Sequence, residues 1–138
     1  MKRKILCVCF GNTCRSPMLQ AFLSEKLRDK DFTVESAGLA DRFGASASLH
    51  AVECMRKKGL DITNHRSRKV SDLALISYDH IYCVEEALVP QLIALGAPKD
   101  KIEVVEVSNP YGKDFETYRT CAEVLSRLAT TLASKLNQ

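Results

Sequence analysis

The stretch KILCVCFGNTCRSPMLQ, residues 4–20, decides the fold of this 138-residue chain. Residues 4–10 are dominated by strand-forming apolar residues, which is the pattern of a strand buried on both faces of a parallel sheet. Pro17 then occupies the first turn of a helix with Ser16 as its cap, and apolar residues recur beyond it at helical spacing. The stretch therefore predicts a strand, a short loop and a helix.

The rest of the chain repeats this alternation of strands and helices. Further strands are expected at 31–38, 79–87 and 101–107, and further helices at 48–59, 85–96 and 115–136. The pattern predicts an α/β fold, a single-domain open sheet of four parallel strands with helices on both faces, covering residues 1–138. Ligands of such sheets bind beyond the carboxyl ends of the strands, where the loop after the first strand lies.

Composition excludes several classes of function. The chain is 46% hydrophobic and 27% charged, and no apolar run approaches the ~20 residues that a membrane span requires. The net charge is only +3 and basic residues are interleaved with acids, so neither a nucleic-acid partner nor a membrane partner is predicted. The basic, apolar N-terminus indicates the first strand of a cytoplasmic protein rather than a signal peptide. An anionic substrate fits this composition.

Six cysteines would suggest disulfides in a secreted domain, but without a signal peptide they are expected to be reduced thiols. The sequence holds no Cys-x-x-Cys pair, and its three histidines do not fall at metal-ligand spacing. No metal and no other cofactor is therefore predicted.

The loop between the first strand and the first helix carries the chemistry. Its backbone N–H groups and the helix N-terminus can form a cradle for a tetrahedral oxyanion, with Gly11 taking backbone angles closed to other residues and Asn12 the left-handed region. Arg15 can grip two oxygens of the anion. Cys9 lies beneath it as a thiolate nucleophile, and Ser16 can cap the helix, orient the loop or assist the departing thiolate. The predicted phosphate-binding residues are Phe10, Gly11, Asn12, Thr13, Cys14 and Arg15.

The segment VCFGNTCRSPM, residues 8–18, resembles the phosphate-binding signature of the low-molecular-weight protein tyrosine phosphatase superfamily. Further segments resemble that family in the same order: SAG at 36–38, HRSR at 65–68, DHIYCVEEA at 79–87 and NPYG at 109–112. The resemblance implies metal-independent hydrolysis of a phosphorylated protein or peptide through a phosphocysteine on Cys9, releasing inorganic phosphate. It also implies that Ser36 and His65 join Asn12 and Ser16 in a network that holds the loop.

The chain departs from the family at the general acid. The resemblance places an aspartate where this sequence has Asn109, and an amide cannot donate a proton at physiological pH. Three explanations stay open. Asp114, Glu106 or Asp72 stands in as the acid, the natural leaving group needs little help, or the protein is a catalytically weak phospho-binding domain.

Two features point to different substrates. Position 13 is threonine, and the segment GNTCRSPM, residues 11–18, is similar to the bacterial protein-arginine phosphatases of the superfamily. The Thr13 hydroxyl can bond a polar phosphoramidate, or it can bond its own loop. Phe43 and Tyr111 are placed by the resemblance as aromatic pocket walls, which suit phosphotyrosine. Phosphotyrosine and phosphoarginine therefore both remain as predicted substrates, and no oligomeric state is predicted.

Two further hypotheses concern the cysteines. Arsenate reductases share this fold, and Cys83 lies where that branch carries a relay cysteine, but no partner thiol follows it. Cys14 is expected to curl near Cys9, so it could trap an oxidised nucleophile as a disulfide. The alternative for Cys14 is simple packing behind the loop.

Overall fold

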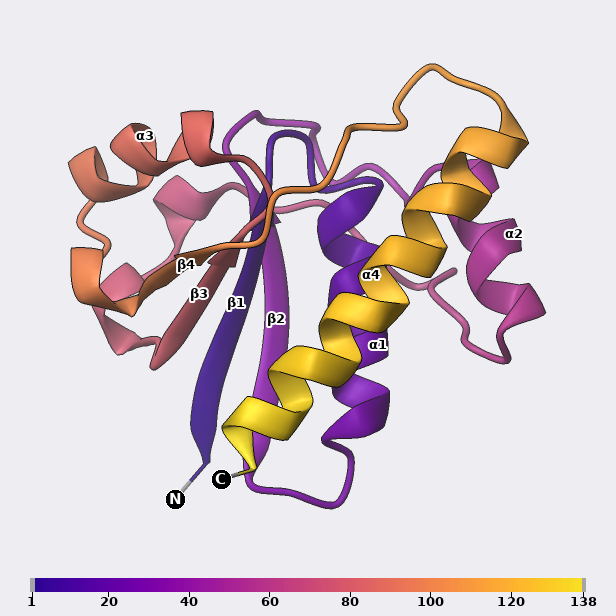
Figure 1. Cartoon of the computed structure of the whole chain (residues 1–138). Coiled ribbons are helices and arrows are strands. Elements are labelled where there is room, and N and C mark those ends of the chain that lie inside the picture. Colours follow the sequence, from indigo (N-terminus) through magenta and orange to yellow (C-terminus); the bar gives the residue numbers. More distant parts are fainter. Residues whose placement is uncertain (1, 138) are drawn as a thin grey trace.

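A computed structural model describes residues 2–137 of the chain. It confirms the predicted α/β architecture, with one sheet of four strands in the order β2-β1-β3-β4 (Figure 1). Every pairing in the sheet is parallel. The strands are β1 (Arg3–Cys9), β2 (Phe32–Gly38), β3 (His80–Cys83) and β4 (Ile102–Val104).

The central strand, β1, positions the loop that follows it. Residues 5–9 of β1 are buried because strands flank it on both sides and helices cover both faces. In the register, Cys9 at the end of β1 pairs with Gly38 at the end of β2, and Val8 pairs with Cys83 at the end of β3. The carboxyl ends of three strands therefore meet at one edge, directly beside the loop that begins at Cys9.

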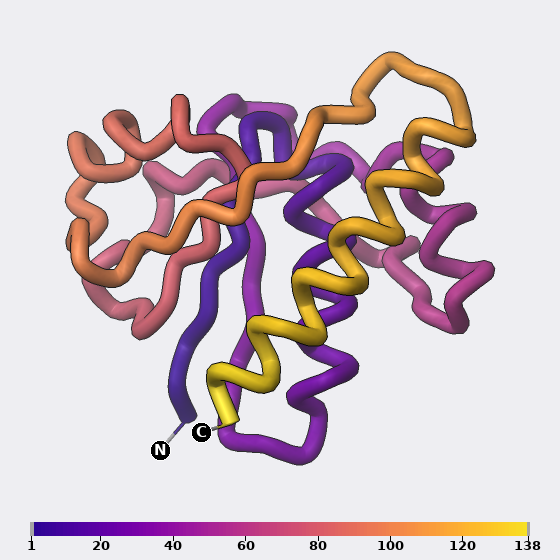
Figure 2. Tube along the Cα trace, viewed as in Figure 1, coloured from indigo at the N-terminus to yellow at the C-terminus, as the bar shows by residue number. Residues whose placement is uncertain are grey.

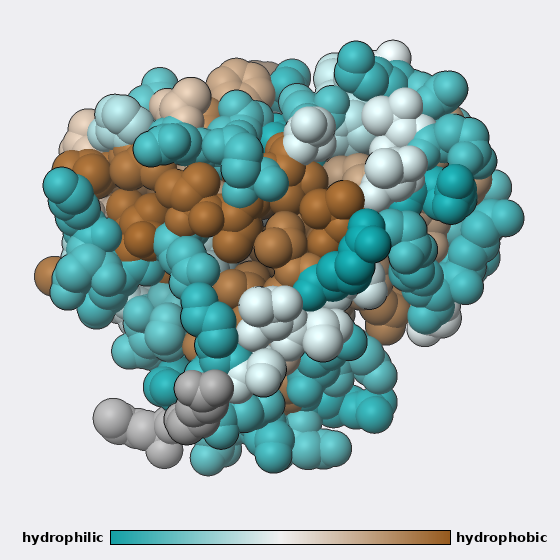
Figure 3. All heavy atoms as spheres, viewed as in Figure 1, coloured by the Kyte–Doolittle hydropathy of each residue, from teal (hydrophilic) through white to brown (hydrophobic). Residues whose placement is uncertain are grey.

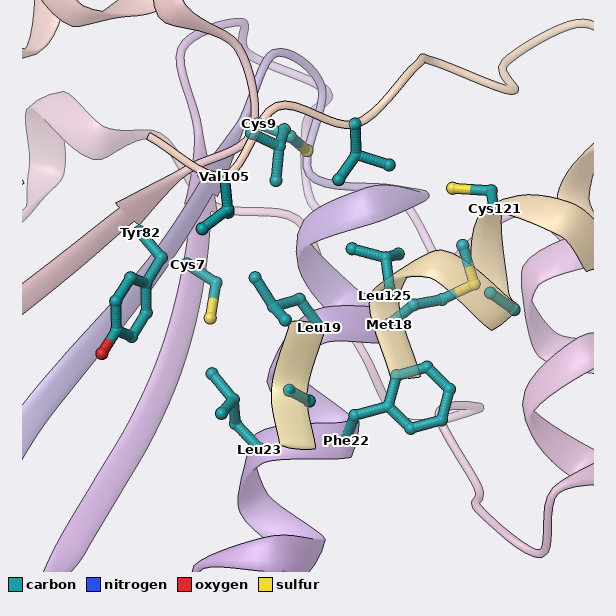
Figure 4. Packing of buried hydrophobic residues seen from close by; sticks show 14 of the residues in the cluster. Cys7, Cys9, Met18, Leu19, Phe22, Leu23, Tyr82, Val105, Cys121 and Leu125 are labelled. Carbon is teal, nitrogen blue, oxygen red and sulfur yellow. The ribbon is translucent and has the colours of Figure 1, made fainter. Parts of the chain in front are cut away.

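Helices cover both faces of the sheet, as the sequence predicts. One apolar cluster joins the sheet to α1, α2 and α4, and a second one on the other face includes Tyr78, Ile81 and Leu92. Figure 4 shows Cys9 at one end of the first cluster, beyond Cys7 and close to Val105. The helices are α1 (Arg15–Lys26), α2 (Leu49–Lys57), α3 (Val89–Ala94) and α4 (Phe115–Leu136).

Two predicted strands are shorter than expected. β3 stops at Cys83, because Glu86–Leu88 already forms a 3-10 turn that leads into α3. β4 covers only three of the seven expected residues, because it pairs only with β3 and the last residue of β3, Cys83, is the partner of Val104. The chain after β4 still follows the sheet, with Val105 N–H donating to the Cys83 carbonyl at 2.8 Å and Val107 N–H to the Val84 carbonyl at 3.0 Å.

The segment between β4 and α4 crosses the edge that holds the loop after β1 (Figure 2). It brings residues from the last third of the chain to the first loop. Figure 3 shows a band of apolar residues running over β4 toward α4. Within residues 2–137, no helix is long and apolar enough to cross a membrane.

Candidate active site

The loop after β1 places the Cys9 thiol among hydrogen-bond donors. Cys9 is 3% exposed, and its Sγ accepts a hydrogen bond from the Asn12 backbone N–H at 3.1 Å. The Ser16 Oγ lies 2.9 Å from the same sulfur. Because Ser16 Oγ already accepts from Asn12 Nδ2 at 2.7 Å, its O–H is free to donate to Cys9. Donors aimed at a sulfur favour its thiolate, the nucleophilic form.

Ser16 is not the helix cap that the sequence predicts. α1 begins one residue earlier, at Arg15, and no side chain caps its first turn. The Ser16 hydroxyl faces Cys9 and Asn12 instead, inside the loop. The Ser16 hydroxyl therefore forms a hydrogen bond with the Cys9 sulfur and does not cap α1.

Asn12 is the residue around which the loop is built. It is fully buried and takes the left-handed region with φ of 56°. Its Nδ2 donates to Ser16 and Ser36, and its Oδ1 accepts from the Arg68 backbone N–H at 3.0 Å. Of the two residues expected to take unusual backbone angles, Asn12 has a positive φ and Gly11 does not. A Cβ on Gly11 would lie 3.0 Å from Arg42 Nε, so the Arg42 side chain packs closely over Gly11 and would have to shift slightly for a larger residue.

Side chains from behind the loop fix Asn12 in place. Ser36 receives the Asn12 Nδ2 bond at 3.0 Å and donates its own hydroxyl to Gln20 Oε1 at 2.6 Å. His65 Nε2 lies 2.7 Å from the Asn12 carbonyl oxygen, which requires the tautomer protonated at Nε2. Burial lowers the pKa of His65 from its usual 6.5. Gly38 completes the support, since a Cβ there would meet the Phe10 carbonyl oxygen at 2.8 Å.

Arg15 is buried with its guanidinium held from two sides. It is 2% exposed, its Nη1 donates to the Val107 carbonyl at 2.8 Å, and its Nη2 donates to Glu85 Oε1 at 2.5 Å. These bonds use two of the five guanidinium N–H donors and fix the plane of the group. Three donors remain for an anion above Cys9, so the fork keeps enough donors to bind two anion oxygens.

A small cavity of about 40 Å³ opens above the thiol. It is lined by residues of the loop and by three side chains from elsewhere, Arg42, Asn109 and Tyr111. A larger cavity of about 410 Å³ lies between α1 and residues 60–65, but Cys9 does not line it. The chemistry of the lining residues, rather than cavity size, identifies the small cavity as the candidate active site. The full lining of the small cavity is Cys9, Phe10, Gly11, Thr13, Cys14, Arg15, Arg42, Asn109 and Tyr111.

The structure separates the two predicted aromatic walls. Tyr111 lines the cavity above Cys9, whereas Phe43 is 89% exposed and lines a neighbouring cavity of about 350 Å³. Arg42 takes the place expected for Phe43, with its guanidinium carbon 5.7 Å from the Phe10 ring centre and 5.6 Å from that of Tyr111. The second aromatic wall of the cavity above the thiol is therefore Phe10.

Asn109 reaches the cavity, but its amide shapes its own loop. The Tyr111 backbone N–H donates to Asn109 Oδ1 at 3.1 Å. None of the three predicted stand-in acids lines the cavity above Cys9. Asp114 caps α4 by accepting hydrogen bonds from the Thr117 hydroxyl and backbone N–H, which lower the pKa of Asp114. Glu106 accepts a hydrogen bond from the Glu86 backbone N–H. Asp72 is exposed near Lys69.

The remaining cysteines divide by location. Cys14 lines the cavity beside Cys9, with its Sγ 3.3 Å from the Tyr118 hydroxyl and 3.4 Å from Ser48 Oγ. Cys83 packs in the cluster on the opposite face of the sheet, and burial raises its pKa. Burial likewise raises the pKa values of Cys7, Cys54 and Cys121. Within residues 2–137, no group of three or more His, Cys, Asp or Glu side chains is placed to hold a metal ion.

Three contributors were not predicted from the sequence: Glu85, Gln20 and Arg42. Glu85 follows β3, and its place at the carboxyl edge of the sheet could have marked it. Gln20 lies one turn beyond Ser16 on α1, so helical spacing could have suggested that it faces the same side. Arg42 had no local signal, because its position depends on how the loop after β2 folds over Gly11.

Comparisons with known proteins agree with this geometry. The sequence model of the family "Low molecular weight phosphotyrosine protein phosphatase" matches residues 4–138. The chain is 31% identical to the low molecular weight protein-tyrosine-phosphatase Wzb of Escherichia coli K12, and also 31% identical to a protein-arginine-phosphatase of Geobacillus stearothermophilus. Each of these alignments covers 99% of this chain and 97% of the other protein.

Solved structures show the same fold. A low molecular weight protein tyrosine phosphatase from T. tengcongensis superposes with a TM-score of 0.90 at 33% identity, over 97% of this chain and 99% of the other. Wzb of Vibrio vulnificus, solved with benzylphosphonate, superposes with a TM-score of 0.88 at 28% identity, over 98% and 99% of the two chains. The chain belongs to the low molecular weight phosphotyrosine protein phosphatase family.

Proposed function

We propose that the protein hydrolyses phosphorylated protein side chains through a phosphocysteine intermediate on Cys9, without a metal ion. One observation carries this proposal: the Cys9 sulfur lies at the base of a cavity with the Asn12 N–H at 3.1 Å, the Ser16 hydroxyl at 2.9 Å and the Arg15 guanidinium along its wall. A nucleophile, a cation and fixed donors for charged oxygens are the parts that phosphoryl transfer requires.

In the first step, the Cys9 thiolate attacks phosphorus as the bond between phosphorus and the leaving atom breaks. The electron pair of that bond stays on the leaving oxygen or nitrogen, which takes up a proton from solvent. The free Arg15 donors and the loop amides stabilise the three equatorial oxygens, on which charge is concentrated in the transition state. Glu85 and the Val107 carbonyl hold Arg15 in position before the substrate arrives, so this stabilisation needs little rearrangement.

In the second step, water attacks phosphorus and the bond between sulfur and phosphorus breaks. The electron pair returns to Cys9, and the water gives up a proton to solvent as inorganic phosphate forms. The Ser16 hydroxyl, placed 2.9 Å from the sulfur, donates a hydrogen bond to the departing thiolate. Ser16 thus assists the second step more than the first.

Protonation of the leaving group is the weak point of this site. Asn109 occupies the acid position and cannot supply a proton, and positioned acid catalysis is typically worth ~10²- to 10⁴-fold. Asp114 is committed to capping α4, and its lowered pKa keeps it ionised. We therefore propose that turnover persists but depends strongly on how well the leaving group departs without help.

Phosphotyrosine is the better supported substrate. Phe10, from the loop after β1, and Tyr111, from the segment before α4, both line the cavity above Cys9, and two aromatic side chains suit a phenyl phosphate. A phenolate also departs more readily than an alkoxide, which fits the absence of an acid at Asn109. Phosphoarginine is the second candidate, since Thr13 lines the same cavity and, within residues 2–137, the hydrogen-bond partner of its hydroxyl is the Cys14 sulfur at 3.7 Å.

Arsenate reduction has less support than phosphate hydrolysis. A relay needs a thiol that Cys9 or Cys14 can reach, and Cys83 packs across the sheet from both. Its thiol donates to the Glu85 carbonyl at 3.1 Å and is kept protonated by burial.

A side-by-side rate comparison tests the proposal. Phosphate release is measured from a phosphotyrosyl peptide, a phosphoarginyl peptide and an activated aryl phosphate, with Cys9→Ser as the control. We expect the aryl phosphate to react fastest, Cys9→Ser to be inactive, and rapid quenching to trap phosphorus on Cys9. Binding of phosphopeptides without any covalent phosphocysteine would instead identify a phospho-binding domain. Rates that do not depend on the leaving group would contradict the role given to Asn109.

A further inference from the structure

Arg42 stands at the border between the cavity above Cys9 and a second cavity. It lines both, together with Thr13 and Tyr111. The second cavity holds about 350 Å³, and its other lining residues are Asp41, Phe43, Ala45, Ser46 and Ser48. A peptide that places its phosphoryl group above Cys9 therefore has room beside it for a neighbouring side chain.

The Arg42 charge is not matched by an acid. Its guanidinium lies between two aromatic rings, those of Phe10 and Tyr111, and among residues 2–137 it forms no ion pair with a carboxylate. Its Nε is buried without any hydrogen-bond partner in the described part of the chain. A buried donor without an acceptor is costly. Nε itself is covered by Gly11, so a ligand's acceptor would bind the terminal nitrogens of the Arg42 guanidinium.

Neighbouring charges leave the border of the two cavities positive. Asp41 precedes Arg42 and lines the second cavity, but its carboxylate faces Lys69 at 3.8 Å and accepts the Phe43 N–H at 2.8 Å. Arg66 adds a second cation, which donates to Ser46 Oγ at 3.0 Å on the same cavity. Arg15 differs from Arg42, because Glu85 offsets its charge.

We propose that Arg42 determines specificity by binding the carboxylate of an acidic residue next to the phosphorylated residue of the substrate. The inference rests on the proposed function, since it needs a phosphorylated residue above Cys9. Adjacent residues of an extended peptide lie ~3.3–3.6 Å apart along the chain, so a neighbouring side chain can reach the second cavity. The planar fork of Arg42 pairs with a carboxylate through two parallel hydrogen bonds, which a neutral amide cannot match.

The test uses phosphotyrosyl peptides that differ at one position, immediately before or after the phosphotyrosine, where they carry Glu, Gln or Lys. For the wild type we expect kcat/KM to be about tenfold higher with Glu than with Gln at one of these positions, and lowest with Lys. In Arg42→Gln the ratio of Glu to Gln falls to about one, and Arg42→Lys retains part of it because it keeps the charge without the fork. An unchanged ratio in Arg42→Gln overturns the proposal.

A matched control separates this effect from net charge. Arg28→Gln makes the same change of charge on an exposed arginine, paired with Glu25 at 3.4 Å beyond the end of α1, and we expect it to keep the wild-type ratio. Raising the salt concentration from ~0.05 to ~0.5 M should shrink the preference for Glu in the wild type, because the pair is partly exposed. A loss of the preference in Arg28→Gln equal to that in Arg42→Gln also overturns the proposal.

A binding measurement keeps this test independent of turnover. Affinities of the same peptides are measured on Cys9→Ser and on the double variant Cys9→Ser/Arg42→Gln. If the wild type hydrolyses no peptide, the proposed function fails. A preference for the Glu peptide in Cys9→Ser that is lost in Cys9→Ser/Arg42→Gln would still support recognition of a carboxylate by Arg42. Equal affinities of the Glu and Gln peptides for Cys9→Ser contradict the role of Arg42 whatever the turnover.

Discussion

The Arg15 guanidinium donates to Glu85 Oε1 at 2.5 Å, so the cation that faces the anion site also carries an ion pair from the segment after β3. Arg15 is 2% exposed and the Glu85 side chain is 30% exposed. A partly buried pair of this kind orients the arginine, but it also offsets the positive charge that attracts the anion. Glu85 thus orients the Arg15 guanidinium but lowers its affinity for an anion.

Replacing Glu85 by Gln should tighten the binding of inorganic phosphate. Gln keeps an oxygen acceptor for Arg15 but removes a negative charge beside the anion site, and we expect the inhibition constant for phosphate to fall by about threefold to tenfold, or ~0.7–1.4 kcal/mol. Inhibition by phosphate of aryl phosphate hydrolysis measures this. Glu86→Gln is the matched control, because Glu86 is exposed and only its backbone is engaged, with Glu106. Weaker phosphate binding in Glu85→Gln would show that orientation of Arg15 outweighs its charge.

The variant Asn109→Asp should restore acid catalysis. The Tyr111 N–H bonds Asn109 Oδ1 at 3.1 Å, and an aspartate keeps that oxygen, so the loop retains its shape. We expect formation of the phosphocysteine to accelerate by at least about tenfold on an alkyl phosphate and to change little on an activated aryl phosphate. Pre-steady-state kinetics on both substrates distinguishes the two effects. Asn64 is exposed and lines the larger cavity beside α1, which Cys9 does not line. The control variant Asn64→Asp should therefore leave both rates unaltered.

The variant Asn12→Ala should destabilise the fold and slow reaction of the thiol. It removes the side chain that bonds Ser16, Ser36 and the Arg68 N–H, and it puts alanine in a left-handed conformation. Unsatisfied buried partners and backbone strain together predict a loss of ~2–4 kcal/mol in the free energy of unfolding. Urea unfolding measures the loss, and iodoacetamide alkylation reports the reactivity of Cys9.

Glycine at the same position separates the two causes. Asn12→Gly loses the side-chain bonds but tolerates φ of 56°, so it should be ~1 kcal/mol more stable than Asn12→Ala. Equal stability of the two variants would mean that backbone strain does not contribute to the loss of stability in Asn12→Ala. A loss below ~0.5 kcal/mol in both would mean that the network contributes little.

The fold could be predicted from the sequence because its signals are local. Apolar runs of strand length alternate with helical periodicity, and a parallel sheet with helices on both faces follows from that alternation. The limits of β3 and β4 could not be predicted in the same way. Residues 101–107 contain Ile102 and three valines, which favour a strand, but only 102–104 pair regularly, because their one partner strand, β3, ends at Cys83 opposite Val104.

The candidate site was predictable where its residues are close in the chain, and less so where distant loops meet. Cys9, Arg15 and Ser16 belong to one short motif, and the structure brings them together around one sulfur. Arg42 and Phe43 are adjacent, and only the path of their loop decides which enters the cavity. The same limit applies to Glu85, whose contact with Arg15 depends on the order of the strands in the sheet.

Stability should fall as the solution becomes mildly acidic. Burial is the main cause that lowers the pKa values of His65 and His80 below 6.5, their value in an unfolded chain. Between that value and the lowered pKa values, the unfolded chain binds more protons than the folded one, so the free energy of unfolding decreases as pH falls through this window. Thermal unfolding measured from pH 7.5 to pH 5 should show a falling midpoint. His80→Gln should make the midpoint less dependent on pH. A wild-type midpoint that rises on acidification would contradict the expected direction of this dependence.

We also propose that Cys14 protects Cys9 from irreversible oxidation. Both thiols line one cavity, whereas burial raises the pKa values of the other four cysteines, which keeps them protonated. Peroxide would oxidise the Cys9 thiolate to a sulfenic acid, and attack by the Cys14 thiol on that sulfur would release water and leave a disulfide. Dithiothreitol then returns both thiols, so we expect wild-type activity to recover after peroxide treatment.

The variant Cys14→Ser should lose that recovery, because its Cys9 proceeds to sulfinic and sulfonic acids. A change at Tyr118 tests how readily the Cys14 thiol reaches Cys9. The Tyr118 hydroxyl lies 3.3 Å from Cys14 Sγ, and burial raises the pKa of Tyr118 to about 12, so it remains a neutral hydrogen-bonding partner that restrains the Cys14 thiol. Tyr118→Phe removes this bond and should form the disulfide faster, as mass spectrometry of the alkylated protein would detect. Full recovery of Cys14→Ser after peroxide would rule out the protective role, because the reversible oxidation of Cys9 would then need no second thiol.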